Sequence, residues 1–275
     1  MAKTSKSIPF AVFKVSGIGR FDLLEIASDN SLTPNPETLK EIAAVKSRFE
    51  RICEAAAKNQ VRLFIDAEET WIQPVLDAWT FEMMCKHNTQ RAIIYNTVQM
   101  YRHDRLEFLK SQLELAKARG VIYGVKLVRG AYMEKERERA QKMGYPSPIQ
   151  PDKSSTDRDY NEALRFMVAH SDHYALCAGS HNEESSMLLT QLMVEKQLDA
   201  TNEKFFFAQL LGMSDHISYN LANGGYNVAK YVPFGPVKEV LPYLLRRADE
   251  NTSVAGQTGR ELGLISAEVI RRKKR

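Results

Sequence analysis

One segment near the C-terminus combines an aromatic ring, two guanidinium groups and a carboxylate at helical spacing. Tyr243, Arg246, Arg247 and Glu250 are spaced i, i+3, i+4 and i+7, so on a helix they lie on one face. Two neighbouring arginines repel each other unless an anion lies between them, and a ligand carboxylate would satisfy both with paired hydrogen bonds. We therefore predict an anion-binding face, with Glu250 holding a guanidinium in position. A solvated helix face with an intrahelical ion pair is the alternative.

A second set of polar side chains follows apolar runs of strand type along the chain. Junctions between strands and loops are commonly polar, but two lysines, Lys14 and Lys126, are expected inside otherwise apolar strands. Because polar residues follow so many of the expected strands, we interpret them as a functional site and not as ordinary strand-to-loop junctions. The polar residues at these ends are Lys14 and Ser16; Asp66, Glu68 and Glu69; Gln99 and Tyr101; Lys126 and Arg129; Ser180, His181 and Asn182; Gln209; and Tyr231.

The elements that position these residues alternate between strand and helix periodicity. Strands are expected at 10–16, 61–67, 92–98, 124–129, 174–179, 205–210 and 228–233, and the clearest amphipathic helices at 35–59, 72–87, 105–119 and 183–198. Apolar strands separated by helices predict an α/β fold whose parallel sheet is covered on both faces.

Two folds of this kind are possible, a doubly wound sheet and a (β/α)8 barrel of the TIM type. The turn after the first strand, Ser16 to Arg20, lacks the third glycine of a dinucleotide-binding loop. Functional groups at the ends of many strands favour the barrel. Since a barrel needs eight strands and seven are found, we expect that the first βα unit is missing; a strand overlooked within 137–156 is the alternative, although that segment is typical of a loop or short helix.

Composition narrows the function classes. The chain has 275 residues with 44% hydrophobic content, which suits a single barrel domain over 1–275. The net charge of +4 is small, and the basic run 271–275 predicts a solvated tail, not a nucleic-acid surface. Three scattered cysteines predict a reducing compartment and no metal site. No apolar stretch is long enough to span a membrane, and no targeting segment is evident at the N-terminus.

Several motifs, in order, resemble those of the proline dehydrogenase family, from about Pro9 to the C-terminus. These are IDAEE (65–69), KLVRGAY (126–132), SHN (180–182), FAQLLGM (207–213), YVPFG (231–235) and YLLRRADEN (243–251). The resemblance implies a barrel that holds FAD at its C-terminal mouth and oxidises L-proline to Δ1-pyrroline-5-carboxylate. The resemblance also implies hydride transfer to the flavin N5, a membrane quinone as the electron acceptor and, with it, peripheral contact with a membrane.

The resemblance also assigns roles to individual residues. Asp66 and Lys126 are the implied catalytic residues, with Lys126 near the flavin N5, where members of the family carry either arginine or lysine; lysine keeps the positive charge but not the forked donor. The implied substrate-binding residues are Lys14, Ala131, Tyr132, Leu210, Tyr231, Tyr243, Arg246, Arg247 and Glu250, of which the two arginines and Lys14 grip the carboxylate. The implied cofactor-binding residues are Ala67, Gln99, Lys126, Leu127, Val128, Arg129, Gly130, Ala131, Ser180, His181 and Asn182.

Three other readings remain open. One is a hydroxyproline dehydrogenase of the same family. The resemblance implies that relatives acting on 4-hydroxyproline carry a smaller residue at this wall of the pocket, so Tyr231 favours proline as the substrate. A Schiff-base aldolase that uses Lys14 or Lys126 is a rival enzyme, and an inactive barrel fragment, which binds FAD poorly, is a rival of another class. The sequence leaves the oligomeric state open, and the compartment open between the bacterial cytoplasm and, for a eukaryotic chain, the mitochondrion.

Overall fold

The computed structural model describes residues 2–5, 7–238, 240–241, 243–245 and 257–273. The chain divides into two compact units, Met1–Lys230 and Tyr231–Arg275, and each is described by itself. The expectation of one domain over 1–275 stays a prediction.

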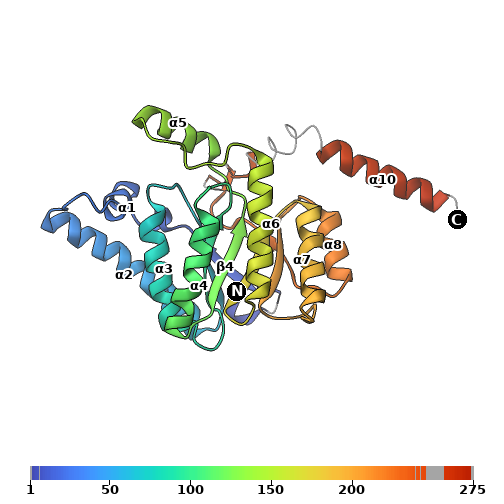
Figure 1. The fold of residues 1–275 in the computed structure, drawn as a ribbon, viewed down its shortest axis with the longest axis horizontal. Coiled ribbons are helices and arrows are strands. Elements are labelled where there is room, and N and C mark those ends of the chain that lie inside the picture. Colours follow the sequence, from blue (N-terminus) through green and yellow to red (C-terminus); the bar gives the residue numbers. More distant parts are fainter. Residues whose placement is uncertain (1, 6, 239, 242, 246–256, 274–275) are drawn as a thin grey trace. The chain divides into compact units, whose positions relative to one another are not determined.

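The first unit is built on a seven-stranded parallel sheet whose strands lie in chain order, β1 to β7. The α/β fold and the seven expected strands are therefore confirmed. Figure 1 shows the helices following one another along the outside of this sheet. The strands are β1 (Phe10–Phe13), β2 (Arg62–Ile65), β3 (Ile94–Gln99), β4 (Tyr123–Val128), β5 (Tyr174–Gly179), β6 (Phe205–Leu210) and β7 (Val228–Tyr231).

The clearest helices begin and end close to their predicted bounds: α2 (Pro36–Lys58), α3 (Gln73–His87), α4 (Arg105–Arg119) and α7 (Glu183–Glu195). Local chemistry explains the ends of two of them. The Asn35 side chain accepts the Thr38 N–H at 2.8 Å before α2, and α4 stops where Gly120 takes a φ of 62°, which glycine adopts without steric cost.

Further helices are α1 (Phe21–Ser28), α5 (Met133–Met143), α6 (Lys153–Ala169) and α8 (Asp215–Asn223). Segment 137–156 is described throughout and holds parts of α5 and α6 joined by a loop. It contains no strand beyond a single antiparallel bridge between Ile149 and Arg102. The expectation of a loop or short helix is therefore right, and the overlooked strand is excluded.

Two apolar clusters lie on opposite faces of the sheet. The larger one joins one strand face to the helices and includes Ile65, Val125 and Leu176. The smaller one fills the other face with aromatic rings, among them Phe10 and Phe64, whose ring centroids are 4.1 Å apart. Since alternate residues of a strand point to opposite faces, this inner packing fixes which polar residues can point inward at the strand ends.

The second unit includes the aromatic pair Tyr231 and Tyr243, with ring centroids 6.2 Å apart, and α10 (Gln257–Lys273). In α10, Glu268 accepts hydrogen bonds from Arg271 and Arg272. The predicted anion-binding residues Arg246, Arg247 and Glu250 lie outside the described residues. None of the described helices combines the length and apolar character that crossing a membrane requires.

Candidate functional site

An ion pair stands at the carboxyl ends of β2 and β4. The Lys126 Nζ donates to Asp66 Oδ1 at 2.5 Å, and the two side chains are only 12% and 10% exposed. Lys126 is in register with Thr97 on β3 and Cys177 on β5, and Cys177 belongs to the inner cluster. Strand alternation therefore places the lysine on the inner face, above the aromatic packing.

Lys14 lies just after β1 and not inside it, so the prediction of a strand reaching residue 16 is wrong. The strand ends at Phe13, and residues 15–17 form a short 3-10 turn. The physical reason is the Glu68 carboxylate, which accepts the Ser16 N–H at 3.0 Å and also the Ser16 hydroxyl. This contact turns the chain and leaves Lys14 at the strand end.

The Lys14 ammonium donates to the Tyr132 hydroxyl at 2.5 Å and lies 5.2 Å from the centroid of the same ring. Partial burial lowers the pKa of Lys14, but Tyr132 and the carboxylates of Glu68 and Asp66 together outweigh it. The pKa is therefore raised above its ordinary value of 10.5, so this ammonium is charged at neutral pH. Lys14 after β1 therefore lies close to Tyr132 after β4 and to the carboxylates that follow β2.

Helix α5 is tied to the loop after β2 by a buried carboxylate that the sequence analysis missed. Glu136 is fully buried, and its oxygens accept the Thr70 N–H at 2.7 Å and the Thr70 hydroxyl at 2.6 Å. Burial raises the pKa of Glu136, opposed by the Thr70 hydrogen bonds. One buried acid is hidden within a charge-dense run, MEKERERA, so hydropathy gives no signal for it.

Gly130 marks a close approach after β4. Its φ is 136°, and a Cβ at this position would lie 2.4 Å from ring atoms of Tyr101. The Tyr101 N–H donates to the Arg129 carbonyl at 2.6 Å, which holds the two segments together. Only glycine fits this backbone, so the turn that leads to Ala131 and Tyr132 is fixed by packing.

The Arg129 guanidinium forms hydrogen bonds with other side chains of the protein. It donates to Asp157 at 2.6 Å, to the Ser180 hydroxyl at 2.8 Å and to the Ser185 hydroxyl at 3.0 Å, and it stacks 4.3 Å from the Tyr160 ring centroid. These contacts join the end of β4 to α6 and to the start of α7. A cofactor contact for Arg129 stays a prediction.

The segment 180–182 is ordered by the start of α7. The Asn182 side chain accepts the Ser185 N–H at 2.9 Å as the helix cap, and the His181 Nδ1 lies 3.0 Å from the Ser214 hydroxyl oxygen. The three residues therefore have defined positions after β5.

The first unit holds most of the residues that the sequence singled out. Gln99 is 3% exposed at the end of β3, and its amide donates to the Glu68 carbonyl at 2.9 Å. Leu210 ends β6 and is partly exposed. Ala67 and Leu127 are buried, and Val128 ends β4. Tyr231 and Tyr243 belong to the second unit. Across the described ranges, no three His, Cys, Asp or Glu side chains are grouped so that they could hold a metal ion.

Comparison with known proteins gives consistent results. A family model described as proline dehydrogenase matches residues 18–260. The chain is 40% identical over 235 residues to "Proline dehydrogenase 1, mitochondrial" of Homo sapiens, covering 84% of this chain and 39% of that protein. It is 42% identical over 229 residues to "Hydroxyproline dehydrogenase" of Xenopus laevis, covering 82% of this chain and 49% of that protein.

Among solved structures, proline utilization A (PutA) from Bdellovibrio bacteriovorus, inactivated by N-propargylglycine, matches with a TM-score of 0.76 and 24% identity. The match covers 89% of this chain and 24% of the other, and at this identity it supports the fold alone. The chain thus spans less than half the length of the human and Xenopus relatives.

Proposed function

Because the chain belongs to the proline dehydrogenase family, we propose that it oxidises L-proline to Δ1-pyrroline-5-carboxylate with FAD as hydride acceptor. The observation that carries the proposal is the Asp66–Lys126 ion pair, held at 2.5 Å at the carboxyl ends of two strands. In barrels of this type, reacting groups lie at that end of the sheet. Lys14 and Tyr132 stand at the same end, joined by their own hydrogen bond.

The residues present fit a flavin. Reduction of a flavin places negative charge on its ring system, and a nearby cation or N–H donor stabilises that charge. Lys126 supplies such a cation, and the buried Gln99 amide lies one strand away in the register of β3 and β4. When bound, FAD supplies the hydride acceptor of the reaction. His181, Asn182 and Ser180 are proposed to bind the remainder of the cofactor.

The protein's own residues then bind substrate and move a proton. Lys14, charged at neutral pH, attracts the substrate carboxylate, and we assign Arg246 and Arg247 to the same carboxylate. The ring nitrogen of proline must lose a proton as the C=N bond forms, and Asp66 is the group we assign to that transfer, directly or through water. The Lys126 ammonium holds the Asp66 carboxylate at 2.5 Å and so fixes the position of the group that accepts the proton.

The electrons are proposed to pass to a quinone, which implies peripheral contact with a membrane. The human relative's name includes "mitochondrial", so a mitochondrial location is the proposal for a eukaryotic chain, and the cytoplasm for a bacterial one.

Hydroxyproline is a second candidate substrate because the Xenopus hydroxyproline dehydrogenase is as similar to the chain as the human proline dehydrogenase, at 42% and 40% identity. Tyr231 distinguishes the two, since a bulky wall leaves less room for a hydroxyl group on the substrate ring. On this basis we favour proline.

The test is a visible spectrum of the purified chain with added FAD, before and after anaerobic L-proline, with trans-4-hydroxy-L-proline in parallel. Flavin absorbance that bleaches faster with proline supports the proposal. Absent flavin binding contradicts the proposal and favours the inactive fragment. Absent flavin binding together with covalent trapping of a carbonyl substrate on Lys14 or Lys126 by borohydride favours the aldolase.

A variant pair tests the role of Asp66. Asp66→Asn should slow bleaching and change its pH profile, because an amide cannot accept the proton. Asp159→Asn is the matched control, since both carboxylates are 7% exposed and Asp159 lies on α6, bonded to Gln150. An unchanged pH profile in Asp66→Asn rules out the assigned proton transfer.

A further inference from the structure

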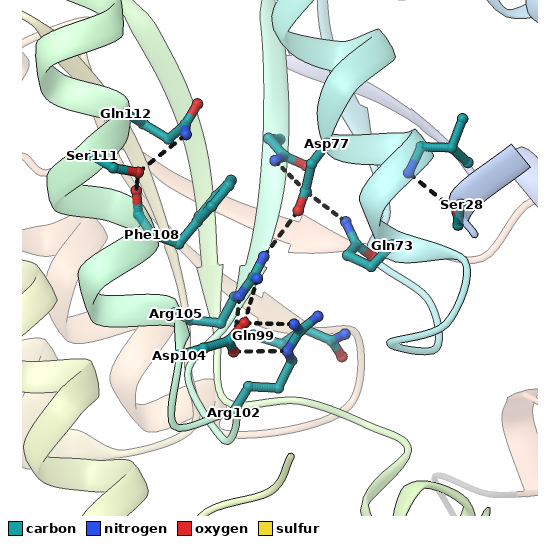
Figure 2. Close-up of polar contacts among 12 residues, drawn as sticks. Ser28, Gln73, Asp77, Gln99, Arg102, Asp104, Arg105, Phe108, Ser111 and Gln112 are labelled. Atoms are coloured by element: carbon teal, nitrogen blue, oxygen red, sulfur yellow. Dashed lines mark hydrogen bonds and ion pairs between the residues drawn. The ribbon is translucent and has the colours of Figure 1, made fainter. Parts of the chain in front are cut away.

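Asp77 of α3 joins three elements through its carboxylate. Its Oδ1 accepts from Gln73 Nε2 at 2.8 Å and from Asn96 Nδ2 at 2.8 Å, and its Oδ2 accepts from Arg105 at 2.9 Å (Figure 2). The side chain is 14% exposed. Hydrogen bonds to an ionised acceptor in such a setting are stronger than neutral ones, so this carboxylate fixes the groups around it.

The first consequence concerns the orientation of Gln73. A carboxylate only accepts hydrogen bonds, so Gln73 must turn its NH₂ group towards Asp77. Its carbonyl oxygen is then directed at the Glu68 N–H, which donates to it at 3.0 Å. If the Gln73 amide were rotated by half a turn, its carbonyl oxygen would face the Asp77 carboxylate and its NH₂ group would face the Glu68 N–H. Neither contact is a hydrogen bond. Asp77 therefore dictates which atom Gln73 offers to the loop after β2.

The second consequence concerns the Glu68 residue, which is held from both sides. Gln73 accepts its N–H, and the Gln99 amide donates to its carbonyl at 2.9 Å. Its side chain accepts both donors of Ser16. Glu68 lies two residues after Asp66, and Ser16 lies two residues after Lys14. The backbone that carries each of these site residues is therefore anchored through Glu68.

We propose that Asp77 is a positioning residue for the site: by orienting Gln73 it fixes the Glu68 backbone and, through it, the places of Asp66 and Lys14. The effect of Asp77 on turnover rests on the proposed function, whereas its effect on the Glu68 backbone does not. Asp77 acts through Gln73 and is assigned no contact with substrate or cofactor.

A neighbouring carboxylate provides a matched control. Asp104 accepts from Arg102 at 2.7 Å and from Arg105 at 2.5 Å (Figure 2), so it shares the Arg105 ion pair with Asp77. Its carboxylate accepts from Arg102 and Arg105 and is not a partner of Gln73. Asp77→Asn and Asp104→Asn therefore both remove one charge from the same network, while only the first disturbs Gln73.

The first measurement is hydrogen–deuterium exchange of the full chain without FAD, resolved at residues 66–70. Asn at position 77 has one acceptor oxygen for the three donors that now face Asp77, and the charged Arg105 is the donor that binds it most strongly. An oxygen turned to Arg105 places the Asn NH₂ group against the Gln73 NH₂ group, so Gln73 loses its fixed orientation. We expect the Glu68 amide to exchange about tenfold faster in Asp77→Asn, the effect of losing one buried hydrogen bond, and by less than about threefold in Asp104→Asn. Equal exchange in the two variants overturns the proposal.

Gln73→Met is the second variant, and it tests the proposal independently if Asp77→Asn does not fold. Methionine has similar length, cannot accept the Glu68 N–H, and leaves Asp77 with Asn96 and Arg105. It should reproduce the faster exchange at Glu68. Unchanged exchange in Gln73→Met overturns the proposal, whatever the behaviour of Asp77→Asn.

The third measurement is kcat and KM for L-proline with FAD bound. Asp77→Asn should lower kcat about tenfold and change KM less, because Asp66, assigned to proton transfer, shifts, whereas Arg246 and Arg247 remain to bind the substrate carboxylate. Asp104→Asn should stay near wild type. If the wild-type chain does not oxidise proline but exchange responds as expected, the proposed function fails and the positioning role stands. If it oxidises proline and both kcat and exchange are unchanged in Asp77→Asn, the positioning role fails.

Discussion

Replacing Arg129 with methionine separates two roles for this residue, cofactor binding and structural support. The guanidinium bonds to Asp157, Ser180 and Ser185, while its side chain is 22% exposed. The family resemblance places the residue among the cofactor ligands. If the guanidinium mainly holds the protein together, its loss should lower the free energy of unfolding even when no flavin is present.

The expected loss in the free energy of unfolding follows from the three hydrogen bonds of the Arg129 guanidinium. The bond to the Asp157 carboxylate is worth about 1.5–3 kcal/mol, and each bond to a serine hydroxyl about 1 kcal/mol. Methionine keeps part of the apolar contact with the Tyr160 ring, and Asp157 keeps Lys153. We therefore expect Arg129→Met to lose about 3.5–5 kcal/mol, a large share of the ~5–15 kcal/mol of a typical domain.

The assay is urea unfolding of the flavin-free chain, followed by fluorescence of Trp71 and Trp79. Arg158→Met is the control: Arg158 bonds to Asp159 but is 64% exposed, so its loss should cost about 0.5 kcal/mol. FAD affinity is measured on the same samples. A variant that keeps wild-type stability within about 1 kcal/mol but no longer binds FAD refutes the reasoning and makes Arg129 a cofactor ligand.

Three further changes have definite expected outcomes. Asn88→Ala should cost about 3–4 kcal/mol in urea unfolding, since the buried amide makes four hydrogen bonds to the backbone of Ile93, Ile94 and Ile122; a cost under about 1 kcal/mol contradicts this. Glu136→Gln should become more stable relative to wild type as pH rises. Burial raises the folded-state pKa of Glu136, so the wild type loses stability as pH rises from the unfolded-state pKa through the folded-state pKa. Glutamine does not titrate, so the variant does not lose this stability. A difference in Tm that stays constant from acid to neutral pH argues against it. Gly130→Ala should destabilise the chain by at least the ~1–3 kcal/mol of a strained backbone, because of its φ of 136° and the Tyr101 ring, whereas Gly17→Ala, with nothing within 4 Å, should change Tm little; similar effects of the two would refute the packing argument.

The sequence predicts the elements of the first unit well because their periodicity is carried by core residues. Each of the seven strands lies within about two or three residues of its expected range, and α4 agrees at both ends. Lys14 is the instructive error. Periodicity continued the first strand through it, but the strand ends at Phe13 because Glu68, distant in the sequence, accepts both Ser16 donors. Local pattern cannot report such a contact.

The site is only partly predictable for the same reason. Asp66 and Lys126 were found because each follows or interrupts an apolar run, and the structure brings them to 2.5 Å. Asp77 was missed, although a single carboxylate in the otherwise apolar run PVLDAW of α3 was a usable signal. Its partners Asn96 and Arg105 come from β3 and α4, and no spacing rule links them.

The chain-order arrangement of the sheet has a consequence for how the protein is made. Every strand from β1 to β6 hydrogen-bonds the strand that is synthesised next. On a ribosome, each newly emerged βα unit therefore finds its docking edge already assembled, without waiting for distant parts of the chain. Contacts between units close in sequence favour fast association, so assembly can proceed in step with translation, and fewer apolar edges stay open to other nascent chains.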